Sequence, residues 1–116
     1  MSLETALDHT LMALADPTRR AILQRLTQGE ARVTELAKPF DMSLNAVSKH
    51  IQVLERAHLV KRRKVGREHF LAANPEPLDA AAAWIEKQRA FWSQRLDLLE
   101  RELKKLDANQ DKRRKT

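Results

Sequence analysis

The chain has 116 residues, a length that suits one domain with a small hydrophobic core. Charged residues make up 33% of it and aromatic residues 4%, with no tyrosine, which favours a helical protein over a β-rich one. The net charge of +6 favours acidic partners, with nucleic acid ahead of an anionic membrane surface. Because there is no cysteine, disulfides, thiolate metal sites and cysteine nucleophiles are excluded.

The start of the chain predicts where the protein resides. Residues 1–15 carry Glu4 and Asp8 among apolar side chains and lack a basic start, so we expect no signal peptide. No apolar run approaches the length needed to span a membrane. These features predict a soluble protein of the cytoplasm.

Two helices are predicted in the first quarter of the chain. One covers residues 3–14, because four leucines at steps of 4, 4 and 3 share one helical face. These are Leu3, Leu7, Leu11 and Leu14. The second covers residues 17–28, because Asp16 is a good N-cap and proline is tolerated at the first helical position. Gly29 then allows a left-handed stop.

A helix-turn-helix pattern follows. Residues 31–33 form a short extended stretch, after which Thr34 is predicted to cap a short helix over residues 35–38. Ser43 is predicted to cap a longer helix over residues 44–57. Only about four residues separate the two helices, and this tight spacing is typical of a helix-turn-helix.

The helix over residues 44–57 has one apolar and one polar face. The apolar stripe consists of Val47, Ile51 and Leu54. The polar face consists of Asn45, Ser48, Lys49 and Gln52, with Leu44 at its N-terminal edge. Amide, ammonium and hydroxyl groups can read base edges in the major groove of DNA. An ordinary solvated face is the alternative, but a short capped helix before it and a basic stretch after it favour DNA contact.

Several motifs occur in a fixed order between residues 10 and 75. They are Ala13-Leu14-Ala15-Asp16-Pro17-Thr18-Arg19-Arg20-Ala21-Ile22-Leu23, Val33-Thr34-Glu35-Leu36-Ala37, Ser43 with Ala46-Val47-Ser48-Lys49-His50-Ile51, and Leu54-Glu55-Arg56-Ala57-His58-Leu59-Val60. With this spacing the chain resembles the ArsR/SmtB family of bacterial regulators. The resemblance implies a winged helix-turn-helix homodimer that binds duplex DNA, usually as a repressor. It also implies a DNA-reading face formed by Ser43, Asn45, Ser48, Lys49 and Gln52.

A basic β-hairpin is predicted after the reading helix, with strands over residues 59–64 and 68–71. Five of the seven residues from Lys61 to Arg67 are basic. In the resembling family this hairpin is the wing, which lies along the DNA backbone. Because side chains alternate along a strand, not all five cations can face DNA. The predicted contacts are Lys64, Gly66 and Arg67, and the alternative is a charged edge that prevents sheet-to-sheet aggregation.

Arg19 and Arg20 fall in the first turn of the second helix, where the helix dipole disfavours cations. A carboxylate or a DNA phosphate would offset this cost. We therefore predict a structural ion pair for at least one of the two.

A long helix is predicted from about Pro77 to Leu106, with apolar positions at alternating steps of four and three. This coiled-coil seam, interrupted once by arginine, consists of Leu78, Ala82, Ile85, Arg89, Trp92, Leu96, Leu99, Leu103 and Leu106. Three further apolar residues lie beside the seam and widen it, namely Trp84, Phe91 and Leu98. We expect residues 107–116 to form a charged flexible tail.

The first and last helices are predicted to form a homodimer interface, as they do in the resembling family. A helix of about 30 residues is about 45 Å long, more than a domain of this size can cover. The interface residues are Leu3, Leu7, Leu11, Ile85, Trp92, Leu96, Leu99 and Leu103. Two-fold symmetry places two reading helices about 34–36 Å apart and predicts an inverted-repeat operator. Packing within one chain is the alternative.

No metal site or other cofactor is predicted. Metal sensors of the resembling family use thiolates, or Asp and His on the last helix, and residues 77–106 contain no histidine. His50 matches a position within the family's helix-turn-helix and is interpreted as a packed structural residue. Trp84, Phe91 and Trp92 could line a pocket for an unknown organic effector, although core packing explains them more simply.

The sequence as a whole predicts a mainly α protein with a small β-hairpin, in which residues 1–106 form one DNA-binding and dimerisation domain. The predicted function is a sequence-specific regulator that binds duplex DNA. The alternative is a protein-interaction module that uses the long helix and has only nonspecific affinity for DNA. An enzyme is not expected, because two glycines cannot build a phosphate-binding loop and no serine–histidine spacing suggests a nucleophile. The operator, the effector and the sign of regulation stay open.

Overall fold

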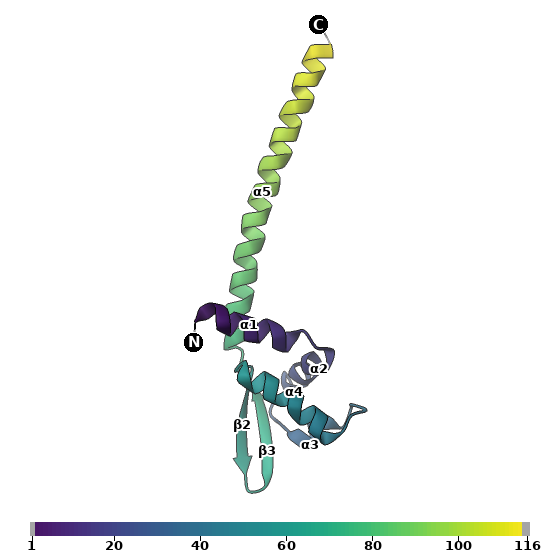
Figure 1. Cartoon of the computed structure of the whole chain (residues 1–116), viewed down its shortest axis with the longest axis vertical. Helices are drawn as coiled ribbons and strands as arrows, with labels where there is room; N and C mark the ends of the chain where they lie inside the picture. Colours follow the sequence, from purple (N-terminus) through teal and green to yellow (C-terminus); the bar gives the residue numbers. More distant parts are fainter. Residues whose placement is uncertain (1, 115–116) are drawn as a thin grey trace. The chain divides into compact units, whose positions relative to one another are not determined.

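The computed structural model describes residues 2–114, apart from the side chain of Leu3, and is shown in Figure 1. In chain order the elements are α1 (Leu3–Leu14), α2 (Pro17–Leu26), β1 (Ala31–Arg32), α3 (Val33–Ala37), α4 (Leu44–Arg56), β2 (Val60–Val65), β3 (Glu68–Ala73) and α5 (Glu76–Arg114). The chain divides into two compact units, one up to Ala81 and one from Ala82 onward. Among the described residues, no helix is both long and apolar enough to cross a membrane.

The predicted N-caps of α2 and α4 are confirmed. Asp16 Oδ2 accepts hydrogen bonds from the backbone N–H groups of Thr18 at 2.8 Å and Arg19 at 3.1 Å. Ser43 Oγ accepts from the N–H of Ala46 at 3.1 Å. These bonds satisfy donors that have no partner inside the helix, so each cap fixes where its helix begins.

The short helix α3 begins earlier than predicted. Thr34 lies within α3, and the N-cap position is taken by Arg32, which makes no side-chain capping bond. The reason is tertiary, because Arg32 ends strand β1 and the chain passes directly from this strand into the helix.

The β-structure has three strands rather than the two of the predicted hairpin. The order is β1-β3-β2, with both pairings antiparallel. Ala31 and Val60 share with Leu71 the buried side of the sheet. The strands β2 and β3 continue beyond this buried part as the hairpin, which Figure 1 shows below α4.

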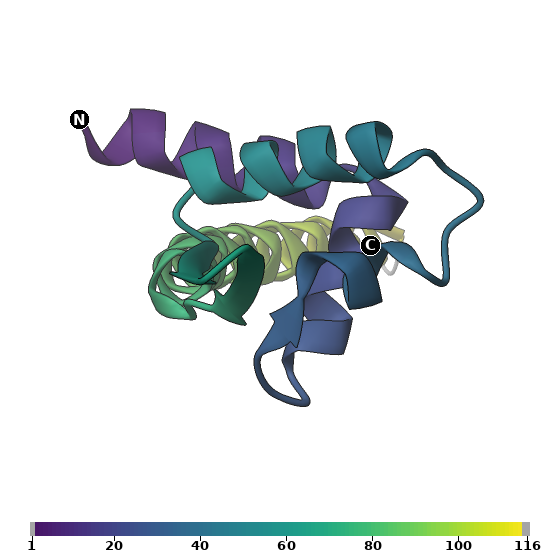
Figure 2. The same cartoon turned by 90° about the horizontal axis from the view of Figure 1, so that it is seen from below.

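One apolar core holds α2, α3, α4 and the sheet together. The predicted stripe of α4 is confirmed, because Val47, Ile51 and Leu54 are all fully buried. They pack in one cluster with residues of the other elements and of the loop after α4, including Ala13, Ile22, Leu26, Leu36, Leu59 and Leu71. Figure 2 shows α1 running alongside α4. Truncating one such leucine or isoleucine to alanine costs about 2–5 kcal/mol, so this core fixes the orientation of α4.

Helix α5 runs to Arg114, eight residues beyond its predicted end at Leu106. Residues 107–114 are therefore helical, and the predicted helix end at Leu106 is wrong. This stretch contains neither glycine nor proline, and ion pairs within the preceding turns support the helix. These pairs join Lys104 to Glu100 at 3.4 Å and Lys105 to Glu102 at 3.7 Å.

Candidate nucleic-acid interface

The polar face of α4 is open to solvent. Asn45, Lys49 and Gln52 are exposed, Ser48 is half-buried, and Leu44 at the N-terminal edge is 50% exposed. Within the described residues, no side-chain hydrogen bond or ion pair occupies Asn45, Lys49 or Gln52. The face that the periodicity assigned to base reading is thus available to a partner.

In the hairpin beside this face, some basic side chains form ion pairs and others do not. Arg62 on β2 donates to Glu55 of α4 at 2.7 and 3.2 Å, and this hydrogen bond raises the pKa of the guanidinium against the opposing effect of burial. Arg63 donates to Glu30, and the bond lowers the pKa of that carboxyl. Because both carboxylates lie outside the hairpin, these two ion pairs connect the hairpin to the rest of the fold.

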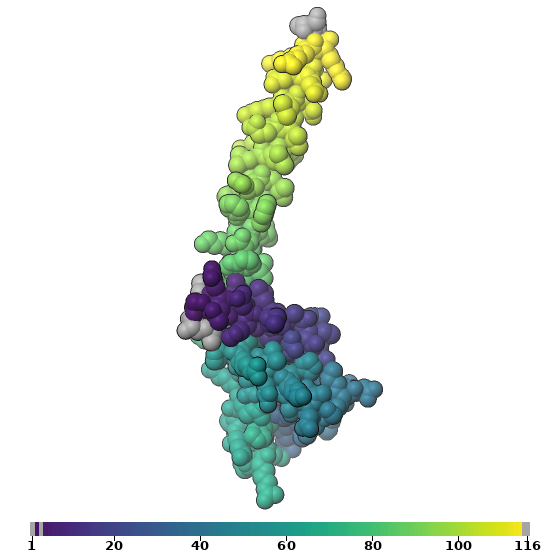
Figure 3. Space-filling model, in the orientation of Figure 1, coloured from purple at the N-terminus to yellow at the C-terminus, as the bar shows by residue number. Residues whose placement is uncertain are grey.

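Two of the predicted wing contacts, Lys64 and Arg67, are among the hairpin cations that form no ion pair within the described residues, and Lys61 is a third. Lys64 and Arg67 are exposed, and no carboxylate lies within ion-pair distance of either in the described part of the chain. Gly66 has φ +62° at the turn, as its predicted role requires. The hairpin tip, the teal projection at the lower end of Figure 3, therefore presents positive charge that no described carboxylate neutralises.

The far side of the sheet carries a separate row of side chains. Phe70 on β3 lies opposite Arg32 on one neighbouring strand and Arg63 on the other. Both guanidinium groups lie over its ring, at 5.7 and 5.0 Å from the centroid. Arg32 also pairs with Glu68 at 3.3 Å. This row occupies two of the basic side chains and stiffens the sheet.

A groove separates the N-terminal half of α4 from the hairpin. Its lining includes Leu44 and Ser48 of α4, Thr34 of α3, and Arg67 and His69 of the hairpin. Thr34 and His69 were not among the predicted contacts. His69 comes to the groove because β3 pairs it with Lys64, and its Nδ1 atom is buried without a hydrogen-bond partner in the described structure. The sequence alone gives no sign of this pairing.

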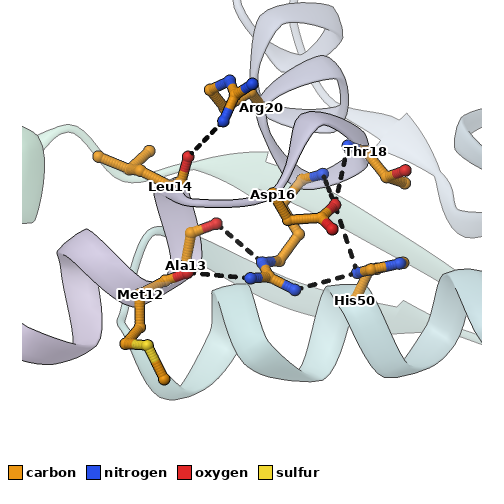
Figure 4. A network of polar contacts seen from close by, with 8 residues as sticks. Met12, Ala13, Leu14, Asp16, Thr18, Arg20 and His50 are labelled. Atoms are coloured by element: carbon orange, nitrogen blue, oxygen red, sulfur yellow. Dashed lines mark hydrogen bonds and ion pairs between the residues drawn. The ribbon is translucent and has the colours of Figure 1, made fainter.

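The prediction of an ion pair for Arg19 or Arg20 is wrong, because both arginines bind backbone carbonyls instead. Arg19 Nε donates to the carbonyl of Ala13 at 2.8 Å and Nη2 to that of Met12 at 2.9 Å. Arg20 Nη1 donates to the carbonyl of Leu14 at 2.9 Å (Figure 4). Carbonyls in the last turn of an α-helix lack the usual partner four residues on, and that of Met12 accepts, besides Arg19, the capping N–H of Ala15 at 3.2 Å. The negative end of α1 also offsets the unfavourable dipole of α2.

His50 of α4 joins the same network. Its Nδ1 atom lies 3.2 Å from Arg19 Nη1 and 3.8 Å from Asp16 Oδ2. Figure 4 marks the contact between His50 and Asp16 with a dashed line. Burial acts to raise the pKa of Asp16, but the N–H groups of Arg19 and Thr18 and the nearby charges of His50 and Arg19 bring it below the ordinary value. His50 is thus a half-buried residue with a structural role, as predicted, and it does not belong to the reading face.

The predicted dimer residues of α5 have exposed side chains in the described structure. Five of them, which are Ile85, Trp92, Leu96, Leu99 and Leu103, are 51–61% exposed. Arg89, the polar residue of the seam, is paired with Glu86 on its own helix, with Nε at 2.9 Å. On α1, Leu11 is exposed and Leu7 is half-buried, while the side chain of Leu3 lies outside the described residues.

The aromatic residues of α5 are also exposed. Phe91 and Trp92 meet edge to face at a centroid distance of 6.1 Å, and Arg95 lies over the Phe91 ring. Trp84, Phe91 and Trp92 do not belong to the core of the single chain. Among the described residues, no cluster of three or more His, Asp or Glu side chains has a metal-binding arrangement.

A short helix, a tight turn, a second helix with an exposed polar face, and a basic hairpin beside it define a winged helix-turn-helix DNA-binding domain. A family model described as a helix-turn-helix domain matches residues 14–63. This match covers α2, α3, α4 and the first part of the hairpin.

Similar proteins place the chain in a family. It is 38% identical to the HTH-type transcriptional regulator Rv2034 of Mycobacterium tuberculosis, over 83% of this chain and 87% of that protein. The crystal structure of the ArsR family transcriptional regulator RHA00566 is 46% identical, with a TM-score of 0.75 over 78% of this chain and 93% of the other. The homodimeric winged helix-turn-helix domain Mb0332 of Mycobacterium bovis is 28% identical, with a TM-score of 0.60 over 79% and 83%. The chain belongs to the ArsR family of winged helix-turn-helix transcriptional regulators, which are not enzymes.

Proposed function

We propose that this protein is a repressor that binds an inverted-repeat operator as a homodimer, with α4 reading bases and the hairpin tip holding the DNA backbone. One observation carries the proposal. The exposed amides and lysine of α4 lie beside a hairpin whose tip cations have no partner within the described chain. A face built for packing within the chain would be covered, and the uncompensated positive charge at the tip suits a phosphate backbone.

The contact proposed for each residue, to a base or to a phosphate, follows from the chemistry of its side chain. Asn45 and Gln52 can each form two hydrogen bonds with adenine, and Lys49 can donate to guanine. Arg67 and Lys64 suit phosphates, because their charge is not already neutralised. Ser43 and Ser48 can serve either a base or a phosphate, and Leu44 and Gly66 allow close approach of the DNA.

Dimerisation is proposed for a second reason besides DNA symmetry. The apolar stripe of α5 is exposed along the helix, and a stripe of this size on a protein surface marks an interaction site. A second copy of the chain offers an identical stripe. The homodimeric relative Mb0332 supports this assignment.

The experiment that tests the proposal is selection of bound duplexes from a random DNA pool. We expect a preferred sequence with two inverted half-sites whose centres are about 10–10.5 base pairs, one helical turn, apart. An enriched single half-site would argue against the dimer. No enrichment at moderate salt would show that only charge drives the binding.

A second candidate function is a protein-interaction module, and the exposed stripe of α5 is the observation that favours it. In that case α5 would pair with a different protein and the winged domain would bind all duplexes alike. Light scattering of the purified chain separates the two functions, because a self-associating stripe gives a dimer at micromolar concentration and a stripe specific for another protein leaves a monomer.

A further inference from the structure

Arg19 is the one side chain that links the carbonyl end of α1 to the proposed reading helix in the network of Figure 4. Two of its nitrogens bond to α1 carbonyls, and the third lies 3.2 Å from His50 Nδ1 on α4. Arg20, its neighbour, bonds to the same end of α1 through Leu14 but does not reach α4. Both arginines therefore bind carbonyls at the end of α1, but of the two only Arg19 also contacts His50.

His50 cannot touch DNA when the reading face does. At about 100° per residue it lies about 200° around the helix from Gln52, so its imidazole points to the opposite side, toward α1 and α2. The positive charge gained on protonation would by itself favour DNA binding, so a loss of affinity on protonation of His50 would have to act through the position of α4.

The two groups beside His50 Nδ1 require different protonation states. A guanidinium is only a donor, so Arg19 can hydrogen-bond to Nδ1 only when that nitrogen carries no proton. The Asp16 carboxylate at 3.8 Å is only an acceptor and attracts Nδ1 once the nitrogen is protonated. Among the described residues, these are the two charged groups that face His50. Helix α1 contributes only backbone carbonyl oxygens to this network. Arg62, the charged residue of β2 that contacts α4, is paired with Glu55.

We propose that Arg19 and His50 are positioning residues for the recognition helix, and that protonation of His50 breaks the Arg19–His50 link and weakens binding to the operator. Neutral His50 accepts from Arg19 and holds α4 against the end of α1. The imidazolium repels the guanidinium and turns to Asp16, so α4 loses this attachment. The inference rests on the proposed function, because operator binding is its readout.

The test compares operator affinity between about pH 8 and pH 5.5, where histidine is the side chain that changes charge. Fluorescence anisotropy on the selected duplex, at constant ionic strength, gives Kd for the wild type, His50→Asn, Arg19→Ala and Arg20→Ala. Asparagine keeps an acceptor near the Nδ1 position but does not titrate. The other histidines are the same in all four proteins, so the difference between wild type and His50→Asn isolates His50.

We expect the wild type to lose about tenfold more affinity than His50→Asn on acidification, the scale of one hydrogen bond to a charged group. Arg20→Ala, the matched control, keeps the wild-type pH response. Arg19→Ala binds more weakly at pH 8 and lacks the His50-dependent step.

Identical pH curves for wild type and His50→Asn, with binding intact at pH 8, overturn the inference and leave the proposed function standing. Absence of selective binding at every pH overturns both. Should His50→Asn fold poorly, imidazole NMR of the wild type decides the question. A proton on Nδ1 at pH 8 contradicts the link, whereas an unprotonated Nδ1 whose titration shifts the α4 amides supports it.

Discussion

His58 adopts a left-handed backbone conformation, φ 59°, immediately after the end of α4. Helices that end in this left-handed conformation usually have glycine at this position, because a β-carbon is strained there. The backbone nevertheless forms the usual closing bonds, with Leu59 N–H donating to the Leu54 carbonyl at 3.0 Å. The carbonyl of His58 also accepts from the Asn74 side chain at 2.7 Å. The surrounding fold therefore maintains a conformation that histidine itself disfavours.

We expect His58→Gly to stabilise the protein by about 0.5–1 kcal/mol, since the relief of strain exceeds the extra chain entropy that glycine loses on folding. Urea unfolding followed by circular dichroism measures the change. His58→Ala is the control, because it removes the imidazole and keeps the β-carbon, and it should bring no such gain. A glycine variant less stable than the wild type would show that the backbone of His58 is not strained.

Lys49 and Gln52 are neighbours on the proposed reading face, and substituting each of them distinguishes a base contact from a phosphate contact. Gln52→Ala should cost about 1–3 kcal/mol on the preferred operator and much less on a scrambled duplex, because a base contact is sequence-specific. Lys49→Ala should weaken operator binding, and its effect on the scrambled duplex shows how much of its contact is to phosphate. Lys87→Ala, a change at an exposed lysine of α5, is the control. Equal losses of affinity on both duplexes for Gln52→Ala would show that Gln52 does not read a base.

At the level of elements, the hairpin is held at its base and open at its tip. Arg62 and Arg63 bond to Glu55 and Glu30, which belong to α4 and to the segment before β1. Exposed ion pairs of this kind contribute little to overall stability. Their effect is positional, because they fix the angle of the hairpin beside α4 while leaving Lys64 and Arg67 without partners.

Arg67→Ala should therefore lower affinity to a similar extent on all duplexes and reduce the salt slope, d log K/d log [salt], by about one. Titrations at several salt concentrations measure that slope. Arg63→Ala removes the same charge from the same hairpin, but this charge is already balanced by Glu30, so the slope should change less. If the two variants have equal slopes, the tip does not contact phosphate.

At the level of the whole molecule, helix α5 has a surface that the single chain leaves uncovered. Its 39 residues span about 58 Å, and its seam and the flanking aromatic residues are exposed. Three of every seven positions are apolar along much of the helix, which is wider than the seam of a two-stranded coiled coil. A partner surface of more than one helix fits this width, and α1 and α5 of a second copy would supply it.

Leu99→Glu should convert the dimer into a monomer, because two-fold symmetry would bury two unpaired carboxylates. Operator affinity should then fall at least about tenfold, since two linked half-sites bind more tightly than one. Size-exclusion chromatography with light scattering measures the mass. Gln94→Glu adds a charge near the same level of the helix but outside the stripe, and should stay dimeric. A dimeric Leu99→Glu variant would place the interface elsewhere.

The sequence by itself determined the features that local chemistry controls. The starts of α2 and α4 follow from Asp16 and Ser43, whose caps form within three residues of chain. The reading face of α4 follows from helical periodicity, because its apolar stripe has only one direction in which to be buried.

Only the tertiary structure decided which basic side chains of the hairpin form ion pairs and which do not. No local pattern distinguishes Arg62 and Arg63 from Lys64, since their partners Glu55 and Glu30 depend on where the hairpin packs. The pairing of β1 with β3, the place of His69 in the groove and the α1 carbonyls beside Arg19 likewise join segments distant in the chain. The physical reason is that a cap or a helical face is set by neighbouring residues, whereas the partner of a long, flexible arginine is set by whichever segment the core brings within its reach.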